Sequence, residues 1–215
     1  MILSKLEPSE HLVELRPHVE KWLELVSHPT WREDPPWWYN ERAQLSQLAG
    51  AIWQMQGWAF EEFATTKREK TPDGEASHYR GRGDFMFWTH HQGRHGGGEQ
   101  FVAEAKVCFP VLGGGKSLQH IQAALTAARG DAGTNKSHRA RYRRLAIVFV
   151  APSAPESKRS KIDERFAALV GQLANESRIV AWHRRARSDI PVRPRAPHRL
   201  FPGTILIVEE VFGRG

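Results

Sequence analysis

The chain has 215 residues, a length that suits one domain with a sizeable hydrophobic core. Its formal net charge of +7 and pI of about 9.8 indicate a polyanionic partner such as nucleic acid, with an acidic membrane as the alternative. No apolar run approaches the roughly 20 residues of a transmembrane helix, and the N-terminus lacks the apolar core of a signal peptide. Because a single cysteine also excludes an internal disulfide, we expect a cytoplasmic protein outside the membrane.

Residues 1–39 are predicted to form an N-terminal helical extension. Apolar residues recur every three or four positions over residues 9–27, and Pro17 is expected to divide or kink this helix. An aromatic cluster follows at Trp31 and residues 35–39. Stacking of these rings on bases is one interpretation, but packing of the segment against the core is more common.

A second helix is predicted from Asn40, a good N-cap residue, to about residue 56. Its apolar stripe includes Leu45, and Glu41 lies four residues earlier on the same face, where an acid is unusual. Glu41 either reaches a functional site or is a favourable acid near a helix N-terminus. The sequence leaves both interpretations open.

Three strands are predicted next, over residues 58–66, 83–88 and 101–107, with a turn and loop over residues 67–79. Because side chains alternate along a strand, Glu104 and Lys106 share one face, while Asp84 shares a face with Met86 and Trp88. If the hairpin register sets Asp84 across from Glu104, two carboxylates and one ammonium converge among core residues. Charges placed there need a partner.

The remaining elements complete an α/β pattern. A helix is predicted over residues 116–129, ended by Gly130, and the apolar run at residues 145–150 predicts a central strand covered on both faces. A helix (161–175), a strand (178–182), a proline- and arginine-rich loop (184–199) and a closing strand (204–211) follow. We therefore expect a single domain with a central mixed sheet flanked by helices. Its core, residues 40–151, has the order αβββαβ, and residues 152–215 extend the sheet by a helix and two strands.

The two carboxylates and the lysine predict a metal-dependent site. Close carboxylates repel each other, and Mg²⁺ relieves that repulsion because it binds one or two carboxylates together with waters and substrate phosphate. Such a site cuts phosphodiesters, and Lys106 would orient or deprotonate the attacking water. A second acidic-x-Lys triplet, Glu156-Ser157-Lys158, lies in a Pro/Ser-containing stretch. Strand context therefore distinguishes Glu104-Ala105-Lys106.

Asp84, nineteen intervening residues and then Glu104-Ala105-Lys106, placed on the second and third strands, resemble the PD-(D/E)xK nuclease superfamily. The resemblance covers about residues 40–150 and implies a restriction-endonuclease-like fold. It departs from the superfamily's name at one position, because Arg82-Gly83 precede Asp84 where the name has proline. The implied activity is that of a Mg²⁺-dependent endonuclease acting on DNA, with Mn²⁺ as a substitute.

The resemblance also implies a role for each site residue. Asp84, Glu104 and the backbone carbonyl of Ala105 would hold the metal ion, and Lys106 would position the water. Glu41 would hold a second ion or a bound water, in line with the first of its two interpretations. A glutamine of the following helix often supports such sites, and the candidates here are Gln119 and Gln122.

Several basic residues are candidates for contacts with the DNA backbone, because each neutralised phosphate releases counterions and adds affinity regardless of sequence. They are Arg80 and Arg82 beside Asp84, Lys116 at a helix start, and Lys136, Arg139, Arg141 and Arg143 in a basic stretch. Duplex cleavage usually needs two active sites, which is consistent with a homodimer. The alternatives are a non-catalytic nucleic-acid-binding module with this fold, and the same chemistry on RNA.

Overall fold

A seven-stranded mixed sheet lies between two helical layers in a computed structural model that describes residues 3–7, 9–70, 76–90, 98–134, 142–186, 189–190 and 198–212. Only the backbone is described for residues 3–4, 66–70 and 76–80. The strand order is β1-β7-β9-β5-β4-β3-β2. The strands are β1 (Leu3–Glu7), β2 (Trp58–Lys70), β3 (Ala76–Trp88), β4 (Gln100–Cys108), β5 (Arg143–Val150), β7 (Arg178–Arg184) and β9 (Gly203–Glu210). The predicted α/β class with a central mixed sheet is confirmed.

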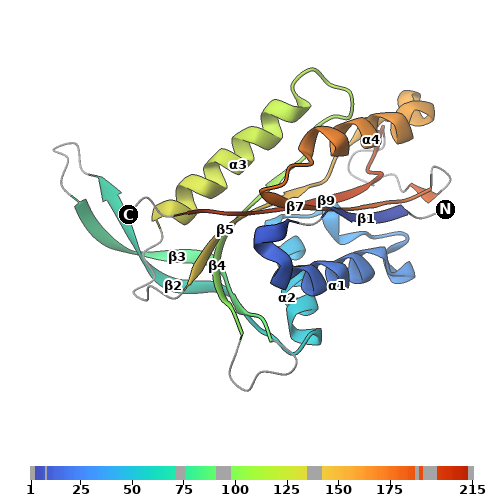
Figure 1. Ribbon diagram of the computed structural model, residues 1–215. Helices are drawn as coiled ribbons and strands as arrows, with labels where there is room; N and C mark the ends of the chain where they lie inside the picture. The colour runs from blue at the N-terminus through green and yellow to red at the C-terminus, as the bar shows by residue number, and fades with distance from the viewer. Residues whose placement is uncertain are drawn as a thin grey trace.

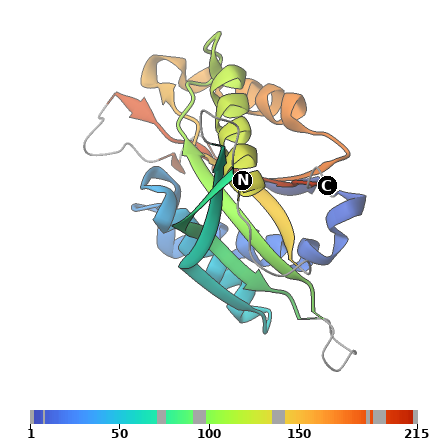
Figure 2. The same ribbon diagram turned by 90° about the vertical axis from the view of Figure 1, so that its left-hand side faces the viewer.

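Helices cover both faces of this sheet. Figure 1 shows α1 (Arg16–Ser27) and α2 (Glu41–Gln54) on one face, and α3 (Ser117–Thr134) and α4 (Ile162–Leu173) on the other. In the turned view the β2–β3 hairpin is nearest the viewer, between the two layers (Figure 2). The smaller elements are the strand pair β6 (Ala154–Pro155) and β8 (Arg199–Leu200), and the 3-10 helices η1 (Glu10–Leu15), η2 (Pro29–Trp31), η3 (Pro36–Trp38) and η4 (Glu156–Lys161).

The strand β5 forms the centre of the sheet, as its unbroken apolar run predicts. It pairs in parallel with β4 and antiparallel with β9, and all six residues from Leu145 to Val150 are buried. Odd-numbered side chains of this run pack with α1 and α2, while even-numbered side chains pack with α3 and α4. The strand β5 therefore contributes to both hydrophobic cores, as do β7 and β9.

Two predicted helix features are confirmed. The Asn40 side chain caps α2, because its Oδ1 accepts a hydrogen bond from the Ala43 N–H at 3.0 Å. The first predicted helix is divided into η1 and α1, with Leu12 in a non-helical conformation and Pro17 in the first turn of α1. Pro17 begins the second piece because its missing N–H is tolerated there.

Three elements differ from the sequence predictions. The predicted loop over residues 67–79 is too long, because β2 continues to Lys70 and β3 begins at Ala76, paired as far as Lys70↔Ala76; its central residues 71–75 lie outside the described residues. The helix α3 continues past Gly130 to Thr134, since Ala128 and Ala132 both pack into the core. The N-terminal segment is not wholly helical, because β1 adds an antiparallel edge strand to β7. No helix in the described ranges combines the length and apolarity needed to span a membrane.

The aromatic segment near residue 37 packs into the protein, as the commoner of its two interpretations predicts. Trp37 and Trp38 are buried, and the Trp37 ring lies 5.5 Å from the His183 ring and 4.9 Å from the Arg185 guanidinium carbon. Arg185 also donates hydrogen bonds to the carbonyls of Trp31 and Arg32. These contacts attach the segment to the end of β7.

The pH dependence of stability tests this packing. Burial, with a smaller effect of the Arg185 charge, lowers the pKa of His183 from 6.5 to about 4. The folded protein then favours neutral His183. The contribution of this residue to the unfolding free energy is complete above pH 6.5 and is lost as the pH falls through about 4. Between pH 7 and pH 4, the wild type should lose about 3 kcal/mol more unfolding free energy than His183→Gln, measured by urea denaturation. Parallel losses in the two proteins would contradict this account.

Candidate active site

The predicted hairpin register places Asp84 beside the Glu104-Ala105-Lys106 triplet. The backbone pairing of β3 and β4 includes Phe85↔Ala103, and continuing this register sets Asp84 across from Glu104. At this point the Asp84 side chain replaces the backbone of β3 as the hydrogen-bond partner of β4, because its Oδ2 accepts a hydrogen bond from the Ala105 N–H at 2.9 Å. The Glu104 side chain is 1% exposed. Two carboxylates thus lie on neighbouring strands where β3 separates from β4.

Lys106 reaches across to α3, where it forms an ion pair with Asp131. The distance from Lys106 Nζ to Asp131 Oδ2 is 2.8 Å. Burial alone would lower the pKa of Lys106, but the hydrogen bond and charge of Asp131, together with the charges of Asp84 and Glu41, raise it overall. Lys106 is therefore held as a cation in this arrangement.

Asp131 is the member of this cluster that the sequence analysis missed. The predicted helix ended at Gly130, which left Asp131 in a loop. The signal that could have found it is the four-residue spacing of Ala128 and Ala132, which continues the apolar face of the helix. An acid in the last turn of a helix is unfavourable for the helix dipole, and the Lys106 cation compensates for it.

Glu41 lies within electrostatic range of the same groups. The pKa of Glu41 is raised, chiefly by burial and further by the nearby Asp84 and Asp131 carboxylates. The Lys106 cation lowers it in part. The residue begins α2 directly after its Asn40 cap. The structure therefore brings Glu41 within electrostatic range of Asp84, Lys106 and Asp131, and a functional role for this acid stays a prediction.

Arg82, on the same strand as Asp84, belongs to an ion-pair cluster with Glu62 of the neighbouring strand β2 and Arg42 of α2. Glu62 lies across from Asp84 and has a left-handed backbone conformation with φ of 52°, which is uncommon for a residue other than glycine. Its carboxylate accepts hydrogen bonds from Arg42 and, at 3.0 Å, from Arg82 Nη1. The Arg82 side chain is 75% exposed, so it remains open to an anion beside the site.

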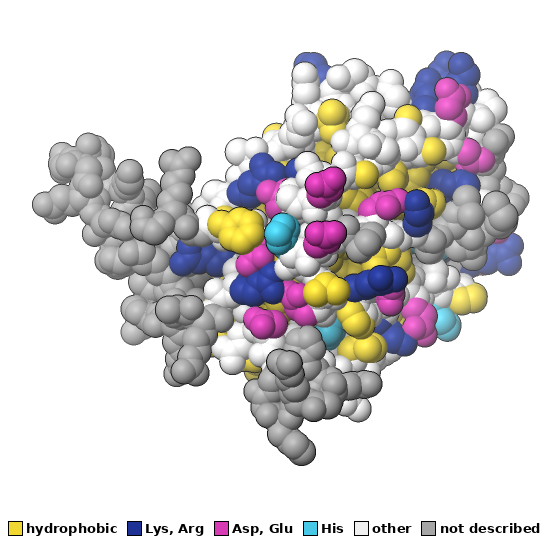
Figure 3. Space-filling view, viewed as in Figure 1, with side chains coloured by type: hydrophobic (Ala, Val, Ile, Leu, Met, Phe, Trp, Pro, Cys, Tyr) yellow, Lys and Arg dark blue, Asp and Glu magenta, His cyan; other side chains and the backbone are white. Residues whose placement is uncertain are grey.

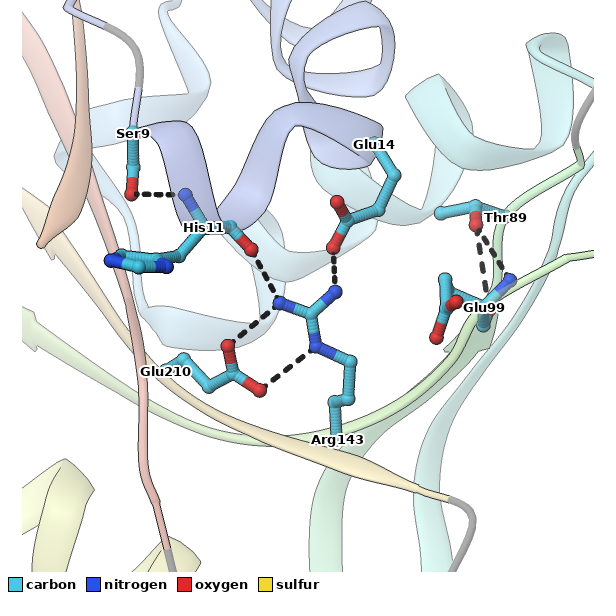
Figure 4. A network of polar contacts seen from close by, with 7 residues as sticks. All are labelled: Ser9, His11, Glu14, Thr89, Glu99, Arg143 and Glu210. Atoms are coloured by element: carbon cyan, nitrogen blue, oxygen red, sulfur yellow. Dashed lines mark hydrogen bonds and ion pairs between the residues drawn. The ribbon is translucent and has the colours of Figure 1, made fainter.

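Arg143 is engaged by acids of the protein itself, and its contact with phosphate stays a prediction. Its guanidinium forms two hydrogen bonds with the Glu210 carboxylate, at 2.8 and 2.7 Å, and pairs with Glu14 (Figure 4). It also donates to the His11 carbonyl. The Glu14 and Glu210 side chains are 8% and 12% exposed, so Arg143 neutralises two largely buried acids and attaches η1 to the sheet.

The other predicted residues lie apart from the cluster or outside the description. Lys116 is exposed just before α3. Gln119 and Gln122 are exposed near the start of α3, about 18 and 14 Å along the helix from Asp131, so the structure does not bring them to the site. Lys136, Arg139, Arg141 and the side chain of Arg80 lie outside the described residues.

The charges on the surface are mixed. On the face in Figure 3, Lys and Arg side chains alternate with Asp and Glu side chains over the middle of the molecule. Among the described residues, no group of three or more His, Cys, Asp or Glu side chains is arranged to hold a metal ion. A Mg²⁺ ion does not require three, because it commonly binds one or two carboxylates with water and substrate oxygens completing its shell.

No model of a known protein family matches the chain, and comparisons with curated proteins and with solved structures return no significant match. The function of the chain is therefore inferred from its fold and from the geometry of the cluster.

Replacement of Arg143 separates a structural role from a nucleic-acid contact. Arg143→Gln leaves two largely buried carboxylates without their cation, and we expect a loss of about 3 kcal/mol or more of unfolding free energy. The control is Arg16→Gln, which removes an exposed pair with Glu20 and should cost about 0.5 kcal/mol or less. Denaturant unfolding measures both. An Arg143→Gln protein as stable as the control but with weakened DNA binding would show that the predicted phosphate contact is the main role.

Proposed function

We propose that this protein is a Mg²⁺-dependent nuclease that hydrolyses phosphodiester bonds in DNA, with a restriction-endonuclease-like core over residues 40–151. The observation that carries the proposal is the convergence of Glu41 from α2, Asp84 from β3 and Lys106 from β4, beside buried Glu104. The order α2-β2-β3-β4-α3-β5 matches the αβββαβ order of the superfamily that the sequence resembles.

The oxygen donors of the site fit a hard cation. Asp84 and Glu104 occupy neighbouring positions on two strands, and the charge of Asp84 raises the pKa of nearby Glu41. In a strand the N–H and C=O of one residue point to the same side, so the Ala105 carbonyl faces the side where its N–H meets Asp84. Asp84, Glu104 and Ala105 would hold Mg²⁺, which when bound stabilises charge on the scissile phosphate and lowers the pKa of a bound water.

Lys106 acts as a cation in this proposal. Its raised pKa and its ion pair with Asp131 favour donation of hydrogen bonds to the attacking water or the phosphate over removal of a proton from that water. Asp131 fixes the direction from which the ammonium approaches. Arg82, exposed beside Asp84, would contact the backbone of the strand that is cut.

Plasmid cleavage tests the proposed activity. Purified protein with supercoiled DNA should nick it in Mg²⁺ or Mn²⁺ but not in EDTA. We expect Asp84→Asn and Lys106→Ala to lower the rate about a hundredfold or more, because each removes charge that acts on the reacting phosphate. The matched control is Lys158→Ala in the second acidic-x-Lys triplet, which lies in η4 with its lysine exposed and should cut like the wild type.

The other outcomes are equally informative. Cleavage that survives Lys106→Ala but disappears in Lys158→Ala would contradict the site. DNA that is bound but stays intact under every metal condition would favour the non-catalytic binding module. Cleavage of RNA in place of DNA, with the same dependence on Asp84 and Lys106, would keep the chemistry and change the substrate.

A further inference from the structure

A cavity of about 430 Å³ opens at the Trp88 end of β3, away from the carboxylates. Its lining includes Trp58, Phe60 and Trp88, together with the amide side chains of Gln56 and Gln100. This volume falls within the range of small-molecule binding sites, about 300–1,000 Å³, and the mixture of rings with a few polar groups is typical of such sites.

Two rings of this cavity, Trp58 and Phe60, are exposed yet held in place, while Trp88 is partly buried against Tyr142. Trp58 is 58% exposed and Phe60 45% exposed. Trp58 contacts the Trp53 ring at 5.3 Å, and Phe60 meets Trp88 edge-to-face at 5.8 Å between ring centroids. Large exposed apolar patches are uncommon on a protein surface without a binding role. Ordered aromatic faces of this kind accept flat ligands with little loss of side-chain entropy.

The cavity shares a face of the sheet with the candidate active site. Phe85 and Phe87 point into the core against α1 and α2, so Asp84 and Trp88 both point to the opposite face. On that face α3 packs over β4 and β5, while Trp58 and Phe60 of the edge strand β2 stay exposed. Trp88 lies four residue steps along β3 from Asp84, about 13 Å, a distance of a few nucleotides.

We propose that this cavity binds unpaired bases of a DNA strand by stacking them on Trp58, Phe60 and Trp88, with the strand continuing along β3 toward Asp84. The direction of the strand rests on the proposed function. Bases inside a duplex have both faces covered by their neighbours, so only unpaired bases can stack on protein rings. Gln56 and Gln100 supply donors and acceptors for base edges, and exposed Arg82 lies beyond Asp84 on the same face to contact phosphate.

Charge favours a DNA strand as the occupant over a second copy of this chain. The chain carries a net charge of +7, so two copies repel each other while a polyanion is attracted. Arg42 is 66% exposed and Arg82 75% exposed, and they share the single acid Glu62 beside the path of the strand. Arg82 lies at the Asp84 end of the path, about 20 Å along β3 from Trp88, where it would contact the phosphate of the bound strand.

Binding measured in EDTA tests the proposal without requiring cleavage. The probes are a fluorescent 15-residue oligothymidylate and a blunt, loop-free duplex of equal charge, and fluorescence anisotropy measures the binding of each. The double variant Trp58→Leu, Phe60→Leu removes both exposed rings but keeps apolar strand residues. We expect it to bind the single strand roughly ten- to hundredfold more weakly and to bind the duplex within about threefold of the wild type. The control is Phe109→Leu, a 40% exposed ring at the far end of β4, about 30 Å from Gln100.

Two results would overturn the proposal. One is a double variant that binds the single strand as tightly as the wild type. If sedimentation also shows that the wild type is a dimer and the double variant a monomer, the rings form an interface between two copies of the chain. The other is an equal loss of affinity for single strand and duplex. Because no metal is present, a protein that never cuts DNA can still pass this test, and a nuclease can fail it.

Discussion

The hydrogen bond from the Ala105 N–H to the Asp84 carboxylate is the contact on which the candidate site depends. Backbone pairing between β3 and β4 includes Phe85↔Ala103, and the side chain of Asp84 then takes the donor that β4 presents. This side-chain hydrogen bond holds the Asp84 carboxylate beside the Glu104-Ala105-Lys106 triplet. A charged acceptor also makes a stronger hydrogen bond than a neutral carbonyl, so the position of Asp84 is well defined.

The two helical layers bring the remaining charges to this point from separate elements. Glu41 begins α2, whose buried face packs in the core on one side of the sheet. Asp131 comes from α3 on the other side, and it pairs with Lys106. The central strand β5 is buried on both faces and ties these layers together. The charges are therefore positioned by rigid elements, which is the arrangement that a site acting on a charged phosphate requires.

Local patterns in the sequence were sufficient for much of this arrangement. The alternation of side chains placed Glu104 and Lys106 on one face of their strand, and the Asn40 cap fixed the start of α2 beside Glu41. Each of these inferences depends on neighbouring residues only. The apolar run of β5 likewise shows its burial directly, because a strand covered on both faces has no polar side.

Other features depend on contacts between distant segments and could not be inferred in this way. The helix α3 continues through Gly130 because Ala132 is buried against the sheet, and this places Asp131. Arg143 pairs with acids 67 and 129 positions away in the sequence, so its structural role is invisible locally. Which aromatic residues are buried depends on how distant elements pack: Trp37 is buried, while Trp58 on the edge strand β2 stays 58% exposed.

The most direct test of the central claim is the position of the metal ion. Crystals of the protein grown with a short DNA duplex and Mn²⁺ should show an anomalous difference peak in contact with the carboxylates of Asp84 and Glu104, next to a phosphate. That result would place the metal, the substrate and Lys106 at one point. A peak bound elsewhere, or ordered DNA whose phosphates avoid Asp84, would contradict the account.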